Sequence, residues 1–233
     1  MYLYIDGNRM EAQQDKSLRE LVAEAGLDAD SLSRRPLAAK IAGEVFTLNY
    51  IPVRSKDAQP ERNSIRRAME ASKGVIRLLR YSDAMGKEVY IRTVQFVIFL
   101  AIRQLWPEAR AKMTCTLGDS VYIAISGAQG YSATRLKERI ASLVEQDIPL
   151  IRRRVPLAAA RERYIREGQH DKARLLSWRS ADYFDEYYYE DFADYYYGEM
   201  LPSTGYLQVW DLLPADGGAL LVYPDNLNPD RCA

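Results

Sequence analysis

The sequence predicts an α+β protein, and three observations support this fold class. Short alternating or apolar stretches bounded by Gly, Asp or Pro indicate strands, and stretches with apolar residues three and four apart indicate amphipathic helices. Both kinds recur along 233 residues that are 48% hydrophobic and 27% charged, a balance typical of a globular protein with a buried core. A polar segment with two prolines divides the chain. We therefore expect a first domain at residues 1–54, a linker at 55–63 and a second domain at 64–229.

The first domain is predicted to contain a hairpin, a helix and a second hairpin. YLYI and NRMEA flank an Asp-Gly pair, which supplies the positive φ of a tight turn between two strands. In SLRELVAEAG, Ser17 and Glu20 have the spacing of a capping box, and Gly26 is suited to the end of a helix. LAAKI and VFTL, joined through Gly43, indicate the second hairpin.

The second domain contains the most apolar part of the chain. Residues 93–106 are apolar nearly all round, which predicts a central helix that is buried on most sides and ended by Pro107. The other segments have helical or strand-like patterns. We expect helices in ERNSIRRAMEASKG, SATRLKERIASLVEQ, VPLAAARERYIREG and DKARLLSWR, and strands in VIRLLRY, KMTCTLGDSVYIAIS, DYFDEYYY, DYYYG, YLQVWDLL and ALLVYP.

Composition argues against several classes of protein. The formal net charge is zero, so no global basic field points to nucleic acid. The longest apolar run, FVIFLAI, is far shorter than the ~20 residues of a membrane-spanning helix, and the N-terminus lacks the layout of a signal peptide. Cys115, Cys232 and His170 are too few and too scattered for a typical zinc site, and two cysteines in an unsecreted chain are more often thiols than a disulfide. We expect a cytoplasmic protein with no metal site and no membrane contact.

The order of these segments resembles that of a known protein family. The first domain is similar to the small β-grasp TGS domain that opens threonyl-tRNA synthetases. LWPEA, DIPLIRRRVP, GQHDKARLL, DYYYGEMLPSTGYLQVWDLL and GGALLVYP resemble, in that order, the second N-terminal domain of threonyl-tRNA synthetase, which is related to the editing domains of the threonyl and alanyl enzymes. The chain as a whole is similar to the N-terminal half of bacterial uridine kinase-like proteins of the phosphoribulokinase/uridine kinase family.

In the synthetase domain, a His-x-x-x-His on the long helix and a later Cys-x-x-x-His remove mischarged amino acids. The resemblance places Arg92 and Phe96 at the two histidine positions, and it places Tyr196 and Met200 at the later Cys and His positions. Phenyl, phenol and thioether groups neither bind zinc well nor relay protons at neutral pH. A buried Arg92 would need a carboxylate partner, for which Asp194 or Glu199 is the natural candidate. The resemblance thus implies a degenerate cleft, without hydrolytic groups, at Arg92, Phe96, Asp194, Tyr196 and Met200.

The resemblance assigns the chemistry of the parent protein to a domain outside this chain. A uridine kinase needs a G-x-x-x-x-G-K-[ST] loop to hold ATP, and this pattern does not occur; GAQGYSATR has glycines before a helix but lacks the lysine. ATP and magnesium are therefore expected only in the kinase domain, and no cofactor is expected here. PDNLNPDRCA ends about where that domain would begin, which favours a fragment over a stand-alone protein. We expect a non-catalytic regulatory or binding module of a nucleoside kinase, with the kinase domain and a small regulatory ligand or RNA as partners and an oligomer as a further option.

The zero net charge hides a segregated distribution. Residues 150–179 contain nine bases and three acids, whereas residues 180–200 contain seven acids and no base. The two segments can pair with each other and with solvent, which is the commoner arrangement. Alternatively, the basic segment contacts a partner subunit or the kinase domain, or it is the RNA-binding face of an adaptor protein. That candidate face comprises Arg152, Arg153, Arg154, Arg161, Arg163, Lys172 and Arg174. A free-standing aminoacyl-tRNA deacylase is a further alternative.

Overall fold

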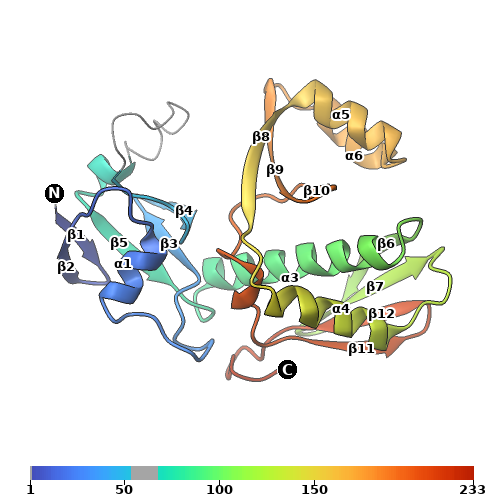
Figure 1. Cartoon of the computed structure of the whole chain (residues 1–233), viewed down its shortest axis with the longest axis horizontal. Coiled ribbons are helices and arrows are strands. Elements are labelled where there is room, and N and C mark those ends of the chain that lie inside the picture. The colour runs from blue at the N-terminus through green and yellow to red at the C-terminus, as the bar shows by residue number, and fades with distance from the viewer. Residues whose placement is uncertain (1, 54–67) are drawn as a thin grey trace. The chain divides into compact units, whose positions relative to one another are not determined.

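The computed structural model describes residues 2–53 and 68–233 and confirms the predicted α+β fold class (Figure 1). The chain divides into a larger unit, Met1–Pro149 with Gly198–Ala233, and an inserted unit, Leu150–Tyr197. The predicted linker at 55–63 lies outside the described residues.

A five-stranded mixed sheet of the β-grasp type begins the larger unit, with the strand order β2-β1-β5-β3-β4. Its strands are β1 (Tyr2–Ile5), β2 (Asn8–Glu11), β3 (Ala38–Ile41), β4 (Glu44–Thr47) and β5 (Val75–Leu79), and neighbours are antiparallel except for β1 with β5. The helix α1 (Leu18–Glu24) begins after Ser17, which forms the predicted capping box with Glu20. The apolar side of α1 is buried, and Figure 1 shows the helix against one side of the sheet.

The strand β5 belongs to a different sheet from the one that the sequence indicated. VIRLLRY was expected in the second domain, but β5 pairs with β1 on one side and with β3 on the other. Without β5, the inner edges of the two hairpins would each expose a row of unpaired backbone groups, so this strand is what joins them into one sheet. Of the helix predicted in ERNSIRRAMEASKG, residues 68–71 are helical and 61–67 lie outside the described residues.

The central helix of the larger unit is α3 (Ala84–Leu105), which begins well before the predicted span of 93–106. It lies with α4 (Ala133–Glu145) on an antiparallel sheet of order β11-β12-β7-β6 (Figure 1). The strands of this second sheet are β6 (Arg110–Thr116), β7 (Ser120–Ser126), β11 (Asp211–Ala215) and β12 (Gly218–Val222). The strands β6, β7 and β12 occur where the sequence predicted strands, whereas β11 begins only at Asp211, five residues after the start of the predicted strand YLQVWDLL. Among the described helices, none is both long enough and apolar enough to cross a membrane.

The inserted unit packs two helices on a three-stranded antiparallel sheet of order β10-β9-β8. Its elements are β8 (Ile151–Pro156), α5 (Leu157–Arg166), α6 (His170–Ser177), β9 (Tyr183–Tyr189) and β10 (Phe192–Asp194). Tyr164 on α5, Leu176 on α6 and Phe184 on β9 meet in its core. DYYYG was predicted as a strand, but β10 ends at Asp194 and the tyrosines after it lie outside the strands.

Candidate functional site

The motif PSTG (residues 202–205) belongs to the stretch DYYYGEMLPSTGYL, and its side chains connect α4 to the segment that follows Gly198. The hydroxyl of Thr204 donates to the carbonyl of Leu143 near the end of α4 (2.5 Å) and accepts from the backbone N–H of Ile148 (2.8 Å). The hydroxyl of Ser203 donates to the carboxylate of Asp147. A buried threonine that satisfies two backbone groups fixes the chain direction after α4. The motif is therefore structural in these contacts.

The same motif also contacts the part of the larger unit that contains the first sheet. The side-chain amide of Asn49 donates to the carbonyl of Pro202 (2.8 Å). Tyr206 is buried, and the guanidinium groups of Arg19 and Arg35 both lie over its ring, with their central carbons 5.2 and 4.3 Å from the ring centroid. Burial raises the pKa of Tyr206 above its ordinary value, so the ring remains a neutral partner for the two cations.

Arg92 on α3 lies against the chain segment that begins at Gly198. Its Nη1 donates to the backbone carbonyl of Glu199 (2.6 Å), and its Nη2 is 3.9 Å from the carboxylate of Glu88, one turn earlier on the helix. The next residue of α3, Thr93, accepts a hydrogen bond from the N–H of Leu201 (2.9 Å). These two contacts attach the helix to this segment. Glu199, one of the two expected partners of Arg92, thus receives this hydrogen bond at its carbonyl oxygen.

Gly198 leaves room for the guanidinium group of Arg92. The glycine has φ +103°, a conformation that side chains rarely adopt, and a Cβ atom built on it would lie 3.1 Å from the central carbon of the guanidinium group. A larger residue would therefore displace Arg92 or change the backbone. Arg92, at the first aligned histidine position, therefore occupies space that is free only because residue 198 is a glycine.

The other residues of the expected degenerate cleft lie in both units. Phe96 and Met200 are completely buried and belong to the larger unit. Asp194 and Tyr196 belong to the inserted unit. Asp194 is nearly buried; its carboxylate accepts from the ammonium group of Lys172 and from the backbone N–H of Tyr195. A single cleft formed by all five residues stays a prediction.

The resolved pKa shifts among residues 2–53 and 68–233 have two main causes. Burial raises the pKa of tyrosines such as Tyr90 and Tyr206, and hydrogen bonds lower the pKa of carboxyl groups such as Asp211 and Asp230. Within the same residues, no group of three His, Cys, Asp or Glu side chains is placed to hold a metal ion. Cys115 and Cys232 are both free thiols.

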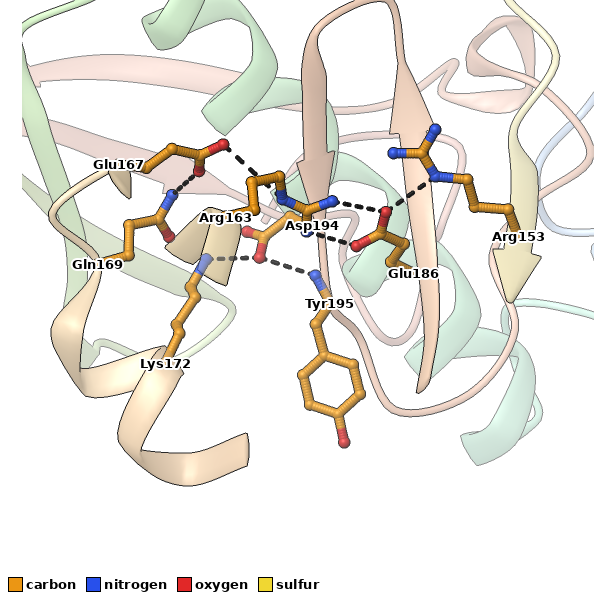
Figure 2. A network of polar contacts seen from close by, with 8 residues as sticks. All are labelled: Arg153, Arg163, Glu167, Gln169, Lys172, Glu186, Asp194 and Tyr195. Atoms are coloured by element: carbon orange, nitrogen blue, oxygen red, sulfur yellow. Dashed lines mark hydrogen bonds and ion pairs between the residues drawn. The ribbon is translucent and has the colours of Figure 1, made fainter. Parts of the chain in front are cut away.

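The inserted unit contains a network of ion pairs, which Figure 2 shows. Glu186 on β9 is completely buried and accepts from Arg153 on β8 and from Arg163 on α5, each at 2.8 Å. Arg163 also lies 3.7 Å from Glu167, which accepts from the side-chain amide of Gln169. A carboxylate buried between two guanidinium groups has both oxygens satisfied, so it ties the sheet to α5.

These contacts show how the segregated charges are arranged. β8 pairs with β9 so that Arg153 is opposite Glu186 and Arg154 is opposite Asp185, and both pairs form ion bridges. The basic and acidic segments therefore neutralise one another within the inserted unit. Further ion pairs hold two of the other candidate residues: Lys172 with Asp194, and Arg174 with Asp171. Arg152 and Arg161 are exposed. Binding of RNA to this segment stays a prediction.

Comparison with known proteins gives a consistent result. The chain is 26% identical to the threonine–tRNA ligase of Symbiobacterium thermophilum over 216 residues, which cover 91% of this chain and 30% of that protein. It is 25% identical to the ligase of Desulforamulus reducens (81% of this chain, 28% of that protein) and 22% identical to that of Xanthomonas euvesicatoria (91% and 31%). The chain is similar to part of threonyl-tRNA synthetase. It spans about a third of the length of these relatives, and no family model matches it.

Sequence reasoning missed several residues that organise the threonyl-tRNA synthetase-like region. Asp147, Thr93 and Tyr206 act through backbone groups or ring faces, and such partners leave no fixed spacing in a sequence. For Asp147, the sequence did offer one signal, which is the glycine at position 205. Gly205 donates its N–H to Asp147 (3.1 Å), and a Cβ atom there would collide with that carboxylate.

Proposed function

We propose that the chain is a non-catalytic binding or regulatory module, built on a threonyl-tRNA synthetase-like scaffold and attached to a uridine kinase-like protein. The observation that carries the first part is the position of Arg92. The residue aligned with a hydrolytic histidine makes a structural contact with Glu199 and Gly198, and Phe96, aligned with the second histidine, is core. Neither a guanidinium group nor a phenyl ring is a zinc ligand or a general base at neutral pH.

The second part of the proposal is supported by the sequence resemblance alone. DYYYGEMLPSTGYL and the segments around it resemble the region that precedes the kinase domain in uridine kinase-like proteins. ATP, magnesium and the nucleoside would then bind to that kinase domain. The module would contribute recognition or control, and its ligand would be a small molecule or RNA.

Two measurements on the purified chain test the module. We expect no hydrolysis of seryl-tRNA(Thr) above the rate without protein, since the aligned positions have no imidazole or thiol. We also expect no heat of binding when magnesium-ATP or uridine is titrated in. Hydrolysis that disappears in the Arg92→Ala or Tyr196→Phe variant would establish a deacylase instead, and tight ATP binding would place the kinase chemistry in this chain. If the reading frame downstream of this chain encodes no Gly-Lys-Ser/Thr loop, the attachment to a kinase is contradicted, but the proposal of a non-catalytic module is not affected.

A further inference from the structure

Residues 223–233 form a loop that closes on itself. Pro224 and Cys232 lie opposite each other as an isolated antiparallel bridge. Between them, the backbone N–H of Asp225 donates to the carbonyl of Arg231 (2.9 Å), and the guanidinium group of Arg231 is 3.3 Å from the carboxylate of Asp225. A compact loop whose ends are close and whose own side chains fill it has a defined shape. This loop can therefore be attached or released as one piece.

The beginning of the loop is attached to the part of the larger unit that contains α3 and the second sheet. The side chain of Asn226 accepts from the ammonium group of Lys87 on α3, and it donates to the carboxylate of Asp119 in the turn between β6 and β7 (2.5 Å). Lys87 also donates to Asp119 (3.1 Å). The hydroxyl of Tyr81 donates to the carbonyl of Pro224 (3.1 Å). Several side chains thus hold this end of the loop.

The other end of the loop is attached to the part that contains the first sheet. The two carboxylate oxygens of Asp230 accept from the backbone N–H and from the hydroxyl of Ser33, which lies between α1 and β3 (2.9 and 2.6 Å). These hydrogen bonds lower the pKa of Asp230 below its ordinary value, so the carboxylate is charged at neutral pH. The segment around Ser33 has a separate support, because the guanidinium group of Arg35 lies over the buried ring of Tyr206. Loss of Asp230 would therefore leave this segment in place.

We propose that residues 223–233 are a releasable strap across the larger unit and that the contact of Asp230 with Ser33 is the point of release. Asp230 is exposed and Ser33 is half-buried, and segments held by a few accessible hydrogen bonds are those that open locally. A negative charge at position 33 would repel the carboxylate of Asp230 and free residues 229–233. Asn226 would still hold the beginning of the strap.

The strap makes the position of residues 229–233 depend on the part of the larger unit that contains the first sheet. The inference does not rest on the proposed function, because none of the residues aligned with hydrolytic groups belongs to the strap or to the contacts described for it.

The two free thiols report the release. Cys232 lies in the strap and is half-buried, whereas Cys115 on β6 is exposed. Burial raises the pKa of the Cys232 thiol, which leaves less of the reactive thiolate at neutral pH. The whole chain is mixed with a chromogenic aromatic disulfide in native buffer, and the Cys115→Ser variant assigns the phases of the reaction. We expect a fast phase from Cys115 and a slow phase from Cys232.

Ser33→Asp should speed the slow phase about tenfold and leave the fast phase unchanged, because hydrogen bonds to a charged acceptor are lost and a repulsion is added. Adding Asp230→Asn should restore the slow phase, since the amide group can donate to the new carboxylate. Leu227→Ser is the matched control: Leu227 is in the same loop but is 97% exposed, so neither phase should change. The midpoint of thermal unfolding should be the same in all of these variants.

The proposal is overturned if Ser33→Asp leaves the slow phase unchanged, or if Cys232 reacts as fast as Cys115 in the unchanged protein. It is also overturned if the two phases accelerate together and the unfolding midpoint falls, because the contact would then only stabilise the fold. Acceleration that persists in the double variant would overturn it as well, since position 33 would then act without Asp230.

Discussion

Gly198 and Arg92 show how one residue determines the space that another occupies. The glycine combines a positive φ with a close approach of the guanidinium group, and either feature alone would disfavour a side chain. The Gly198→Ala variant should lower the free energy of unfolding by about 2–3 kcal/mol, from backbone strain and from displacement of Arg92. Urea unfolding followed by circular dichroism measures this change.

Gly43 is the matched control for this prediction. It has a similar φ, +92°, but a Cβ atom there would meet nothing within 4 Å. Gly43→Ala should therefore cost only the strain, about 1 kcal/mol. In the double variant Gly198→Ala with Arg92→Ala, the two effects should not be additive, because the collision is removed. A Gly198→Ala variant no less stable than Gly43→Ala would show that Arg92 is not held at this position.

At the scale of single residues, the sequence predicted those side-chain contacts whose two partners are close together in the chain. The capping box of Ser17 with Glu20 formed as expected, because three residues fix its geometry. Arg92 was expected to find an acid. Its closer contact is a backbone carbonyl, which every residue has and which no sequence pattern marks.

The strand pair β8–β9 contains two neighbouring ion pairs, one with a buried carboxylate and one with an exposed carboxylate. Adjacent residues of a strand point to opposite sides, so Arg153 and Arg154 meet different surroundings. Glu186, the partner of Arg153, is completely buried, whereas Asp185 and Arg154 keep 30% and 38% of their side chains exposed. The difference lies in the carboxylates: Glu186 is shielded from water, although the Arg153 side chain is 41% exposed, whereas Asp185 is in contact with water.

We expect Glu186→Gln to destabilise the inserted unit by about 3 kcal/mol, because Arg153 and Arg163 would lose their common counter-charge. The neighbouring variant Asp185→Asn should change stability by less than about 1 kcal/mol. Urea unfolding of the whole chain at low and at high salt compares the two, and only the small effect of Asp185→Asn should decrease in salt. Similar losses for both variants would mean that burial does not separate the two pairs.

The sequence predicted helices better than strands at this scale. α4 was expected within one residue at each end, because its apolar stripe and its serine cap are local signals. β8 was not expected, since IRRRVP has neither alternation nor an apolar run. Its strand conformation depends on β9, more than twenty-five residues later, which supplies the opposite charges. β5 is a similar case, because its place depends on two hairpins already being present.

At the scale of the whole molecule, chain order does not reproduce the division into units. The larger unit includes residues before and after the inserted unit, and its segments meet at the PSTG motif through Asp147, Asn49 and Arg35. A reading along the chain places boundaries only in sequence order, so it could not separate an insertion. The predicted boundaries at 54 and 64 stay predictions.

Tyrosine gives the whole molecule its expected pH dependence. The chain has 17 tyrosines, and in the described residues seven have a raised pKa, for which burial is the largest cause: Tyr81, Tyr90, Tyr131, Tyr164, Tyr195 (to about 12), Tyr206 and Tyr223. A raised pKa in the folded state means that the folded protein keeps protons that the unfolded chain releases. Stability is therefore complete below the ordinary phenol pKa of about 10 and falls as the pH rises above it.

We expect the chain to unfold cooperatively in alkali, with tyrosinate absorbance rising in the same pH range as circular dichroism is lost. Tyr90→Phe tests the cause. Its hydroxyl donates to the carbonyl of Val209 (2.8 Å) and accepts from the N–H of the same residue (3.0 Å), so the variant should be less stable at neutral pH by about 1–2 kcal/mol. Above pH 10, however, its stability should fall less steeply, by up to about 1.4 kcal/mol per pH unit, because one releasable proton is gone. If tyrosinate formed completely while the dichroism stayed unchanged, buried phenols would not limit alkaline stability.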